Sequence, residues 1–185
     1  MNFNKKSALA LLSIAFSAIS SIATSVSAET LPQVRFATSA GDFVVELYPD
    51  KAPKTVDNFL QYVRDKHYDG TIFHRVIPNF MVQGGCPNTR PGASGMPGTG
   101  GPGWKIKCET AGNPHQHKLG AISMAHAGKD TGGSQFFVVN GDRSNVKHLD
   151  GVHTVFGQCL SDADIKVVQA IKGNDRIVKA TVVEA

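Results

Sequence analysis

The sequence has few of the features that indicate covalent, redox or metal chemistry. Only three cysteines are present, Cys86, Cys108 and Cys159, and none forms a C-x-x-C pair. No H-E-x-x-H motif occurs, and neither Ser94 nor Ser134 stands in a G-x-S-x-G turn. These absences argue against a thiol oxidoreductase, a zinc protease and a serine hydrolase.

An excess of charge of one sign is also absent. The chain has 19 Lys and Arg against 15 Asp and Glu, which gives a formal net charge of +4. The basic residues are dispersed, and residues 29–185 contain no Lys/Arg run, no repeat and no low-complexity tail. Nucleic-acid-binding proteins usually concentrate their basic residues on one surface. We therefore expect no nucleic-acid partner.

The single long hydrophobic stretch lies near the N-terminus. Lys5 and Lys6 precede an apolar segment from Ala8 to Ile22, and Val26-Ser27-Ala28 is typical of a signal-peptidase cleavage site. The apolar segment is short for a membrane span and rich in Ser and Ala. We expect residues 1–28 to be a cleaved secretory signal, which places the mature protein in the periplasm and off the membrane. The alternative is a retained membrane anchor.

Cleavage after Ala28 shortens the chain from 185 to 157 residues, a length typical of one domain. It also removes two Lys and no acidic residue, so the formal net charge falls from +4 to +2. An odd number of cysteines in an oxidising compartment leaves at least one unpaired in the chain. We expect structural cysteines, and a Cys108–Cys159 bridge stays open as one pairing.

The hydrophobic pattern predicts a mainly β protein with two helices. Strands are expected at Gln33–Thr38, Asp42–Tyr48, within residues 73–85, and at Leu119–Ala125, Gln135–Asn140, Thr154–Cys159 and Arg176–Val183. Helices are expected from Pro53 and from Ser161, the latter ending at Gly173. About eight strands arriving in hairpins favour an antiparallel sheet closed into an eight-stranded β-barrel. Side chains fill such an interior, so the site is expected outside it.

Two further motifs indicate functions that we reject. Gly98-Thr99-Gly100-Gly101-Pro102-Gly103 fits G-x-G-x-x-G, but it opens no helix and lies in a predicted loop, residues 86–118, without a βαβ unit. His115-Gln116-His117 offers two alternate imidazoles for a metal ion. This pair follows Pro114 in the same loop, and no paired-cysteine motif accompanies it. We expect neither a nucleotide cofactor nor a metal.

The segment from Phe73 to Gly85 is the strongest candidate for a functional site. It places one Arg and one Gln in an apolar, strand-forming run that ends in two glycines. Side chains alternate along a strand, so Met81 and Gln83 share one face. In a second strand Gln135 and Phe137 do the same. The pattern indicates an apolar groove with a few hydrogen-bonding groups, whereas the alternative is two core strands with Arg75 reaching to water.

The amino-acid sequence of these segments resembles that of the cyclophilin family of peptidyl-prolyl cis-trans isomerases. The matching motifs, in order, are Phe73-His74-Arg75-Val76-Ile77-Pro78, Phe80-Met81-Val82-Gln83-Gly84-Gly85, Ser123-Met124-Ala125, Gly133-Ser134-Gln135-Phe136-Phe137, Leu149-Asp150-Gly151 with His153, and Val155-Phe156-Gly157. The resemblance extends from about Val34 to the C-terminus. It implies a closed eight-stranded barrel with a helix over each end and a substrate groove on the outer surface.

The resemblance also implies which residues act. Catalytic roles fall on Arg75, Phe80 and Gln83; substrate contacts fall on His74, Met81, Gly98, Ala125, His126, Gln135, Phe137, His148, Leu149 and His153. No cofactor is required, and the partners are proline-containing segments of unfolded or folding exported proteins. We expect a monomer that isomerises X-Pro bonds, and the alternative is a non-catalytic binding module or chaperone for such segments.

Two positions depart from the commonest animal pattern of the family. His126 stands where Asn is usual, which matters little if the contact is made through the backbone. His148 stands where many members carry Trp, a residue important for the drug cyclosporin A. The resemblance therefore implies weak cyclosporin binding without a loss of catalysis.

Overall fold

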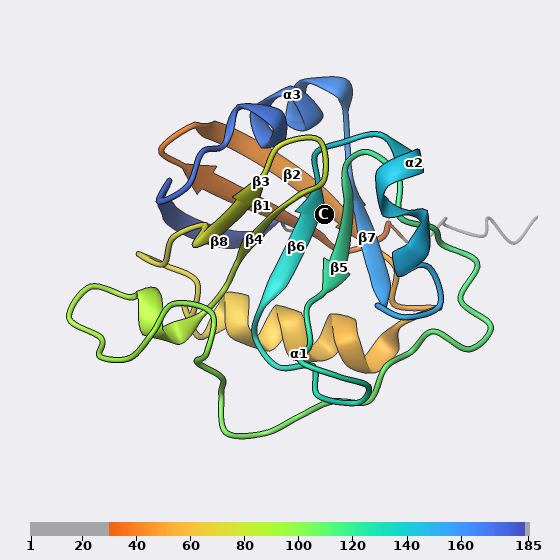
Figure 1. Ribbon diagram of the computed structural model, residues 1–185, viewed down its shortest axis with the longest axis horizontal. Helices are drawn as coiled ribbons and strands as arrows, with labels where there is room; N and C mark the ends of the chain where they lie inside the picture. The colour runs from red at the N-terminus through yellow and green to blue at the C-terminus, as the bar shows by residue number, and fades with distance from the viewer. Residues whose placement is uncertain (1–29, 184–185) are drawn as a thin grey trace, which may run out of the picture.

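Eight antiparallel strands form one curled sheet in the computed structural model, which describes residues 30–183 (Figure 1). The strands are β1 (Gln33–Thr38), β2 (Gly41–Leu47), β3 (Arg75–Ile77), β4 (Met81–Gly84), β5 (Ala121–Met124), β6 (Phe136–Val139), β7 (Val155–Cys159) and β8 (Ile177–Val183). Their order across the sheet is β3-β4-β6-β5-β7-β2-β1-β8. The prediction of a mainly β, eight-stranded antiparallel fold is confirmed. The predicted signal, residues 1–28, lies outside the described residues.

The prediction of a closed barrel is wrong, because β3 and β8 end the strand order and do not pair with each other. The strands form a curled half-barrel. Across the gap, a single antiparallel bridge joins Ile72 to Arg176, and Phe73 N donates to Asp175 O over 2.8 Å. β3 itself has only three residues and pairs only with β4, so the ladder does not continue around the sheet.

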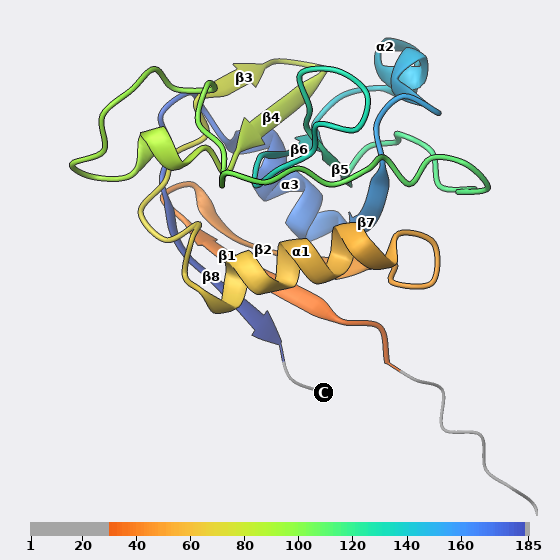
Figure 2. The ribbon, with the colours of Figure 1, turned by 90° about the horizontal axis from the view of Figure 1, so that it is seen from below.

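Helices α1 (Pro53–Arg64) and α3 (Asp162–Ala170) lie at opposite ends of the strands (Figure 1). Figure 2 shows α1 across the mouth of the curled sheet. Pro53 occupies the first turn of α1 as predicted, and the Glu109 carboxylate accepts from the Lys54 and Thr55 backbone N–H groups at 3.1 and 2.8 Å. Ser161 caps α3 as predicted, but the helix ends at Ala170, before Gly173.

A third helix, α2 (Arg143–Val146), was not predicted from the sequence. It runs into a 3-10 turn, η2 (Lys147–Leu149), and another 3-10 turn, η1 (Pro87–Thr89), lies in the long loop. The Asp142 side chain caps α2 by accepting from Ser144 N at 2.8 Å. Among residues 30–183 no helix is both long and apolar enough to cross a bilayer.

The two faces of the sheet carry separate apolar clusters. The larger one lies on the α1 side and includes the fully buried rings of Phe36, Phe43, Phe59, Tyr68, Phe136 and Phe156. The smaller one contains Met81, Ala121, Phe137, Val139, Val146 and Val155, with Phe80, Ala125 and Leu149 partly buried against it. Because side chains alternate along β6, Phe136 enters the first cluster and Phe137 the second. The second cluster forms the outer face of the curled sheet.

The three cysteines are all free, so the Cys108–Cys159 bridge is wrong. Cys86 Sγ accepts from Gly98 N at 3.2 Å, and Cys108 Sγ accepts from Asp130 N at 3.3 Å. Cys159 is buried in β7. The thiols of Cys86 and Cys108 therefore help to hold loop backbone in place.

Candidate active site

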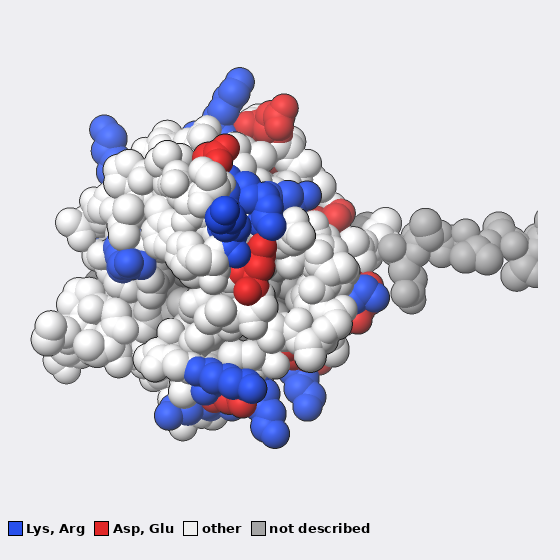
Figure 3. Space-filling model, turned by 45° about the vertical axis from the view of Figure 1, so that its right-hand side comes forward, with Lys and Arg blue, Asp and Glu red and all other residues white. Residues whose placement is uncertain are grey.

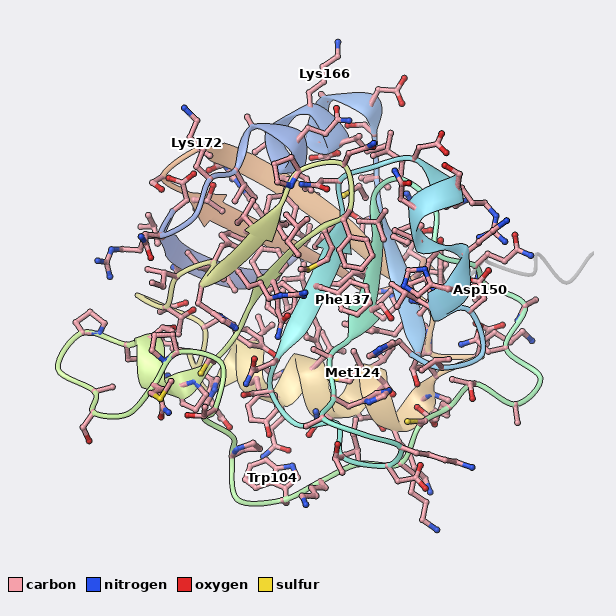
Figure 4. The ribbon with its side chains drawn as sticks, in the orientation of Figure 1. Trp104, Met124, Phe137, Asp150, Lys166 and Lys172 are labelled. Atoms are coloured by element: carbon pink, nitrogen blue, oxygen red, sulfur yellow. The ribbon has the colours of Figure 1, made fainter. Side chains whose placement is uncertain are left out.

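Four side chains form a row across the outer face of the sheet. Arg75 on β3 pairs in register with Gln83 on β4, Gln83 pairs with Phe137 on β6, and Phe137 pairs with Ser123 on β5. Residues paired in register on neighbouring strands point to the same face. Arg75, Gln83, Phe137 and Ser123 therefore share the face that carries the smaller cluster, and Figure 4 shows Phe137 near the middle of it. Arg75, Gln83 and Phe137 were predicted from the sequence as site residues, but their alignment across the three strands was not.

The smaller apolar cluster adjoins this row, and its outer surface is the candidate pocket for proline, called the apolar pocket below. Met81 is 2% exposed and Phe137 is 5% exposed, so both form its floor, with Phe80 and Leu149 partly exposed beside them. Arg75 is exposed, and its Nη1 donates to Met81 Sδ over 3.7 Å. The guanidinium thus stands at the edge of an apolar surface, and most of its donors have no hydrogen-bond partner among residues 30–183.

A tight turn holds Phe80 in this pocket. Asn79 has a positive φ of 57°, and the Phe80 N–H donates to Asn140 Oδ1 over 2.8 Å. Asp142 N donates to Asn79 Oδ1 over 3.0 Å. Between these contacts lies Gly141, where a Cβ atom would come within 2.1 Å of the Asn79 carbonyl carbon. The turn therefore requires glycine at position 141.

A chain of amide groups links the row to the glycine-rich loop. Gln83 Nε2 donates to Gln135 Oε1 over 3.0 Å. Gln135 Nε2 in turn donates to the carbonyl oxygens of Gly98 and Gly100 over 2.9 and 2.8 Å. Among residues 30–183, Gln83 makes this contact rather than one with Arg75. The two glutamines therefore hold the loop against β4 and β6.

His74 lies against Gly98 of the same loop. A Cβ atom on Gly98, whose φ is +89°, would come 3.4 Å from His74 Cδ2. Burial, more than any other effect, lowers the pKa of His74 below its usual value, so the ring is neutral at pH 7. His74 thus packs against the glycine-rich loop at Gly98.

A cavity of about 590 Å³ lies on the other side of the glutamine pair. Five predicted site residues line it: Gln83, Gly98, Ala125, His126 and Gln135. Residues 99–105, Ala127, Thr131, Gly133 and Ser134 complete the lining. Arg75, Phe80, Met81, Phe137, His148, Leu149 and His153 do not line it. The predicted residues therefore form two adjoining parts, an apolar pocket and a cavity lined largely by loop residues, which meet at Gln83.

Trp104 on the cavity wall was not predicted from the sequence. Its ring stacks on Tyr62 of α1 at 5.5 Å and 9°, and its Nε1 donates to Asn58 Oδ1 over 3.0 Å. Asn58 Nδ2 donates to Gly133 O over 2.9 Å. The Asn58 amide on α1 thus holds both loops of the cavity. The feature of the sequence that could have indicated Trp104 is a single Trp in a glycine-rich loop.

A buried polar network behind Phe137 was also not predicted. His117 Nδ1 lies 2.9 Å from Asp150 Oδ1, and His117 Nε2 lies 2.9 Å from Ser123 Oγ. This order matches a hydrolase triad, but His117 and Ser123 are 0% exposed, so no substrate reaches the hydroxyl. The His117 ring stacks on Phe137 at 5.7 Å and 11°. The network therefore supports the pocket floor.

Charges within this network stabilise each other. Arg143 Nη2 donates to Asp150 Oδ2 over 2.8 Å, and Arg143 Nη1 donates to His117 O over 2.9 Å. Partial burial raises the pKa of Asp150, but hydrogen bonds from Arg143 and His117 outweigh it and bring the pKa to about 2. Burial is the main effect that lowers the pKa of His117. The network ties α2 and η2, and with them Leu149, to the strand side of the pocket. Figure 4 shows Asp150 beside α2.

Three of the predicted histidines lie at the rim of the pocket. The exposed His148 ring stacks on Phe80 at 5.9 Å and 7°. His153 meets Phe137 edge-on at 5.4 Å, and its Nδ1 donates to Met124 O over 3.0 Å. His126 stacks on His153 at 4.0 Å and 18°. By contrast, His115 stacks on Tyr48 at 3.9 Å, so it and the buried His117 do not share a site.

The surface charge around the site is mixed. On the face drawn in Figure 3, acidic side chains lie among the Lys and Arg side chains, and uncharged surface covers most of the area. An apolar pocket with one exposed guanidinium at its edge suits an uncharged peptide segment better than a nucleic acid.

The fold and the site define a class of protein: a curled antiparallel sheet with an apolar cluster and an exposed guanidinium on its outer face. Residues 33–184 match the family model for cyclophilin type peptidyl-prolyl cis-trans isomerases, and the chain belongs to this family. It is accordingly an enzyme that interconverts the cis and trans forms of X-Pro bonds. The resemblance of the sequence motifs to this family is thereby confirmed.

Relatives with this activity are similar over most of the chain. The peptidyl-prolyl cis-trans isomerase B of Bacillus subtilis is 60% identical over 116 residues, which cover 63% of this chain and 74% of that protein. An isomerase of Synechococcus elongatus is 46% identical over 153 residues, which cover 83% and 97%. A solved Cryptosporidium parvum cyclophilin with the dipeptide Ala-Pro has a TM-score of 0.70 at 28% identity and covers 83% of this chain and 99% of that chain.

Proposed function

We propose that Arg75 is the catalytic group of this isomerase and that Phe80, Met81, Phe137 and Leu149 hold the proline ring. The main support is the row across the sheet, in which Arg75 and Phe137 flank Gln83 in register. It sets a side chain that is always charged beside an apolar surface that fits a pyrrolidine ring. Gln83 holds the glycine loop and is available to the peptide backbone.

Rotation about an X-Pro bond faces a barrier of about 18–20 kcal/mol, because the amide C–N bond has partial double-bond character. In the twisted transition state the nitrogen lone pair is no longer delocalised. A guanidinium that donates to this nitrogen therefore binds the transition state more tightly than the planar amide. A barrier lower by about 7 kcal/mol corresponds to about five decades in rate. No covalent bond breaks, so the mechanism needs neither a nucleophile nor a cofactor.

The peptide on the N-terminal side of proline lies along Ala125 and His126 toward the cavity. Ala125 packs against the apolar pocket and also lines the cavity, so it marks the passage between the two. Several residues of an extended segment fit in this groove. The clients are proline-containing segments of exported proteins during folding, and the enzyme acts on them as a monomer.

A titration of the labelled protein with an Ala-Pro tetrapeptide tests the site. We expect the methyl resonances of Met81 and Leu149 to shift, because the proline ring packs on them. The resonances of His115, in a separate small pocket beside Tyr48, serve as the control and stay in place. Shifts confined to Tyr48 and His115 would contradict the assignment.

Export is tested by the mass of the protein recovered from cells. We expect a chain that begins at Glu29, because Val26-Ser27-Ala28 is a small-residue cleavage site. The sample is taken from a periplasmic extract and compared with the membrane fraction. An intact chain in the membrane fraction would show that residues 8–22 act as an anchor.

His148→Trp is expected to tighten inhibition by cyclosporin A by about ten- to seventy-fold. The reason is that an indole on Phe80 covers about 60–100 Å² more apolar drug surface than imidazole, worth about 1.5–2.5 kcal/mol. His148 already lies parallel to Phe80 and is exposed, so the larger ring has room. Peptide turnover is measured in parallel and changes less. Equal drug affinity of the two proteins would show that this position does not control it.

A further inference from the structure

We propose that His126 is a positioning residue for the isomerase reaction and acts as a bridge between the two parts of the groove. Its ring joins the cavity loop, residues 127–131, to the rim at Val152 and His153. This inference rests on the proposed function, because it assumes that one peptide occupies both the apolar pocket and the cavity. It assigns a role to the side chain, whereas the sequence indicated only a backbone contact.

The hydrogen bonds of His126 determine its tautomer. Its Nε2 lies 3.0 Å from Val152 O, and a carbonyl oxygen only accepts, so Nε2 carries the proton. Gly128 N donates to His126 Nδ1 over 3.2 Å, so Nδ1 carries a lone pair. Gly128 has a φ of +138°, a conformation for which glycine is suited. Both ring nitrogens are thus used by the backbone of two separate segments.

The ring is also linked to the proline pocket, through its contact with His153. His126 stacks on His153, and His153 meets Phe137 edge-on while it donates to Met124 O. On the cavity side, Ala127 N donates to Thr131 Oγ1 over 3.1 Å, and both residues line the cavity. A displaced His126 therefore disturbs the cavity wall and the side of the pocket together.

Other charged and titratable groups surround this bridge. His153 stacks on the ring, and the ring of His117 lies 6.5 Å from that of His153. Burial lowers the pKa of His153, and the neighbouring His126, His117 and His148 lower it further. Lys105 lines the same cavity. On its own loop, Lys129 is exposed and Asp130 accepts from Cys108 N.

Removal of the ring would break the bridge at two defined atoms. Without Nδ1 the Gly128 N–H loses its acceptor, and without Nε2 the Val152 carbonyl loses its donor. We expect KM to rise for peptides that reach the cavity, with a smaller effect on those that fill only the apolar pocket.

The test compares KM and kcat of the wild type, His126→Ala and His115→Ala, with an extended proline peptide and with a short Ala-Pro peptide. For His126→Ala we expect KM to rise about fivefold with the extended peptide and less than about twofold with the short one, while kcat stays within about twofold of the wild type. His115→Ala, far from the groove, should keep the wild-type KM for both peptides.

The amide resonance of Gly128 gives a second readout, which should move in His126→Ala and stay in place in His115→Ala. An unchanged KM for the extended peptide in His126→Ala, or an equal rise for both peptides, would overturn the proposal. So would a Gly128 resonance that stays in place in His126→Ala. Absence of turnover by the wild type would instead count against the proposed function.

Discussion

Replacing Arg75 by Ala lowers kcat/KM for an Ala-Pro peptide by about 100- to 1,000-fold, the effect expected when one donor to a transition-state charge is removed. The loss follows from the position of Arg75, which is exposed and donates to Met81 Sδ at the edge of the pocket. The fold should stay intact, because an exposed side chain leaves no cavity behind. Circular dichroism and the thermal midpoint should match the wild type.

Arg75→Lys is the matched variant for this experiment. A lysine keeps the charge but presents it as a single ammonium group instead of a planar fork of five donors. We expect turnover between that of the wild type and that of Arg75→Ala. Near-wild-type turnover in Arg75→Ala, with an intact fold, would refute the role of the guanidinium.

Gly141→Ala is expected to destabilise the protein by about 3 kcal/mol, at the upper end of the usual cost of overpacking. The new Cβ would lie 2.1 Å from the carbonyl carbon of Asn79, and the atom it meets is backbone that cannot rotate away. The turn it displaces holds Phe80 through Asn140. Chemical denaturation with a two-state fit measures the change.

Gly173→Ala serves as the control for that measurement. No atom lies within 4 Å of a Cβ placed at Gly173, which is exposed after α3. Its stability should remain within about 0.5 kcal/mol of the wild type. Equal stability of Gly141→Ala and Gly173→Ala would show that the Asn79 turn moves aside easily.

Local patterns predicted the strands well because each strand has one buried and one exposed face. In β2 the burial alternates residue by residue, and this alternation is visible in the sequence. Helix α1 was equally clear, since Val56, Phe59, Leu60 and Val63 recur at helical spacing and are all buried. Such signals depend only on neighbours along the chain.

Features that depend on distant parts of the chain were predicted less well. Whether a curled sheet closes depends on how its first and last strands meet, and β3 is too short to pair with β8. Helix α2 has four residues, fewer than a hydrophobic period needs, although Asp142 is a good cap. The pairing of Cys108 with Cys159 depended on three-dimensional distance alone, for which spacing along the chain carries no information.

The same distinction applies to the site. Alternation put Met81 with Gln83 and Gln135 with Phe137 on shared faces, and the family resemblance supplied the roles. The Gln83–Gln135 hydrogen bond depends on the register of β4 against β6, which a sequence does not specify. The sequence shows His117 beside His115 in a predicted loop. Its ring, however, is bonded to Asp150, a residue 33 positions further along the chain.

Exchange spectroscopy on an Ala-Pro peptide at saturating enzyme tests the central claim most directly, because it separates peptide affinity from the rate of interconversion on the enzyme. If Arg75 acts on the twisted amide, Arg75→Ala should leave Kd within about threefold of the wild type and slow interconversion by about 100-fold or more. Interconversion at the wild-type rate, or a loss of affinity as large as the loss of rate, would contradict the account.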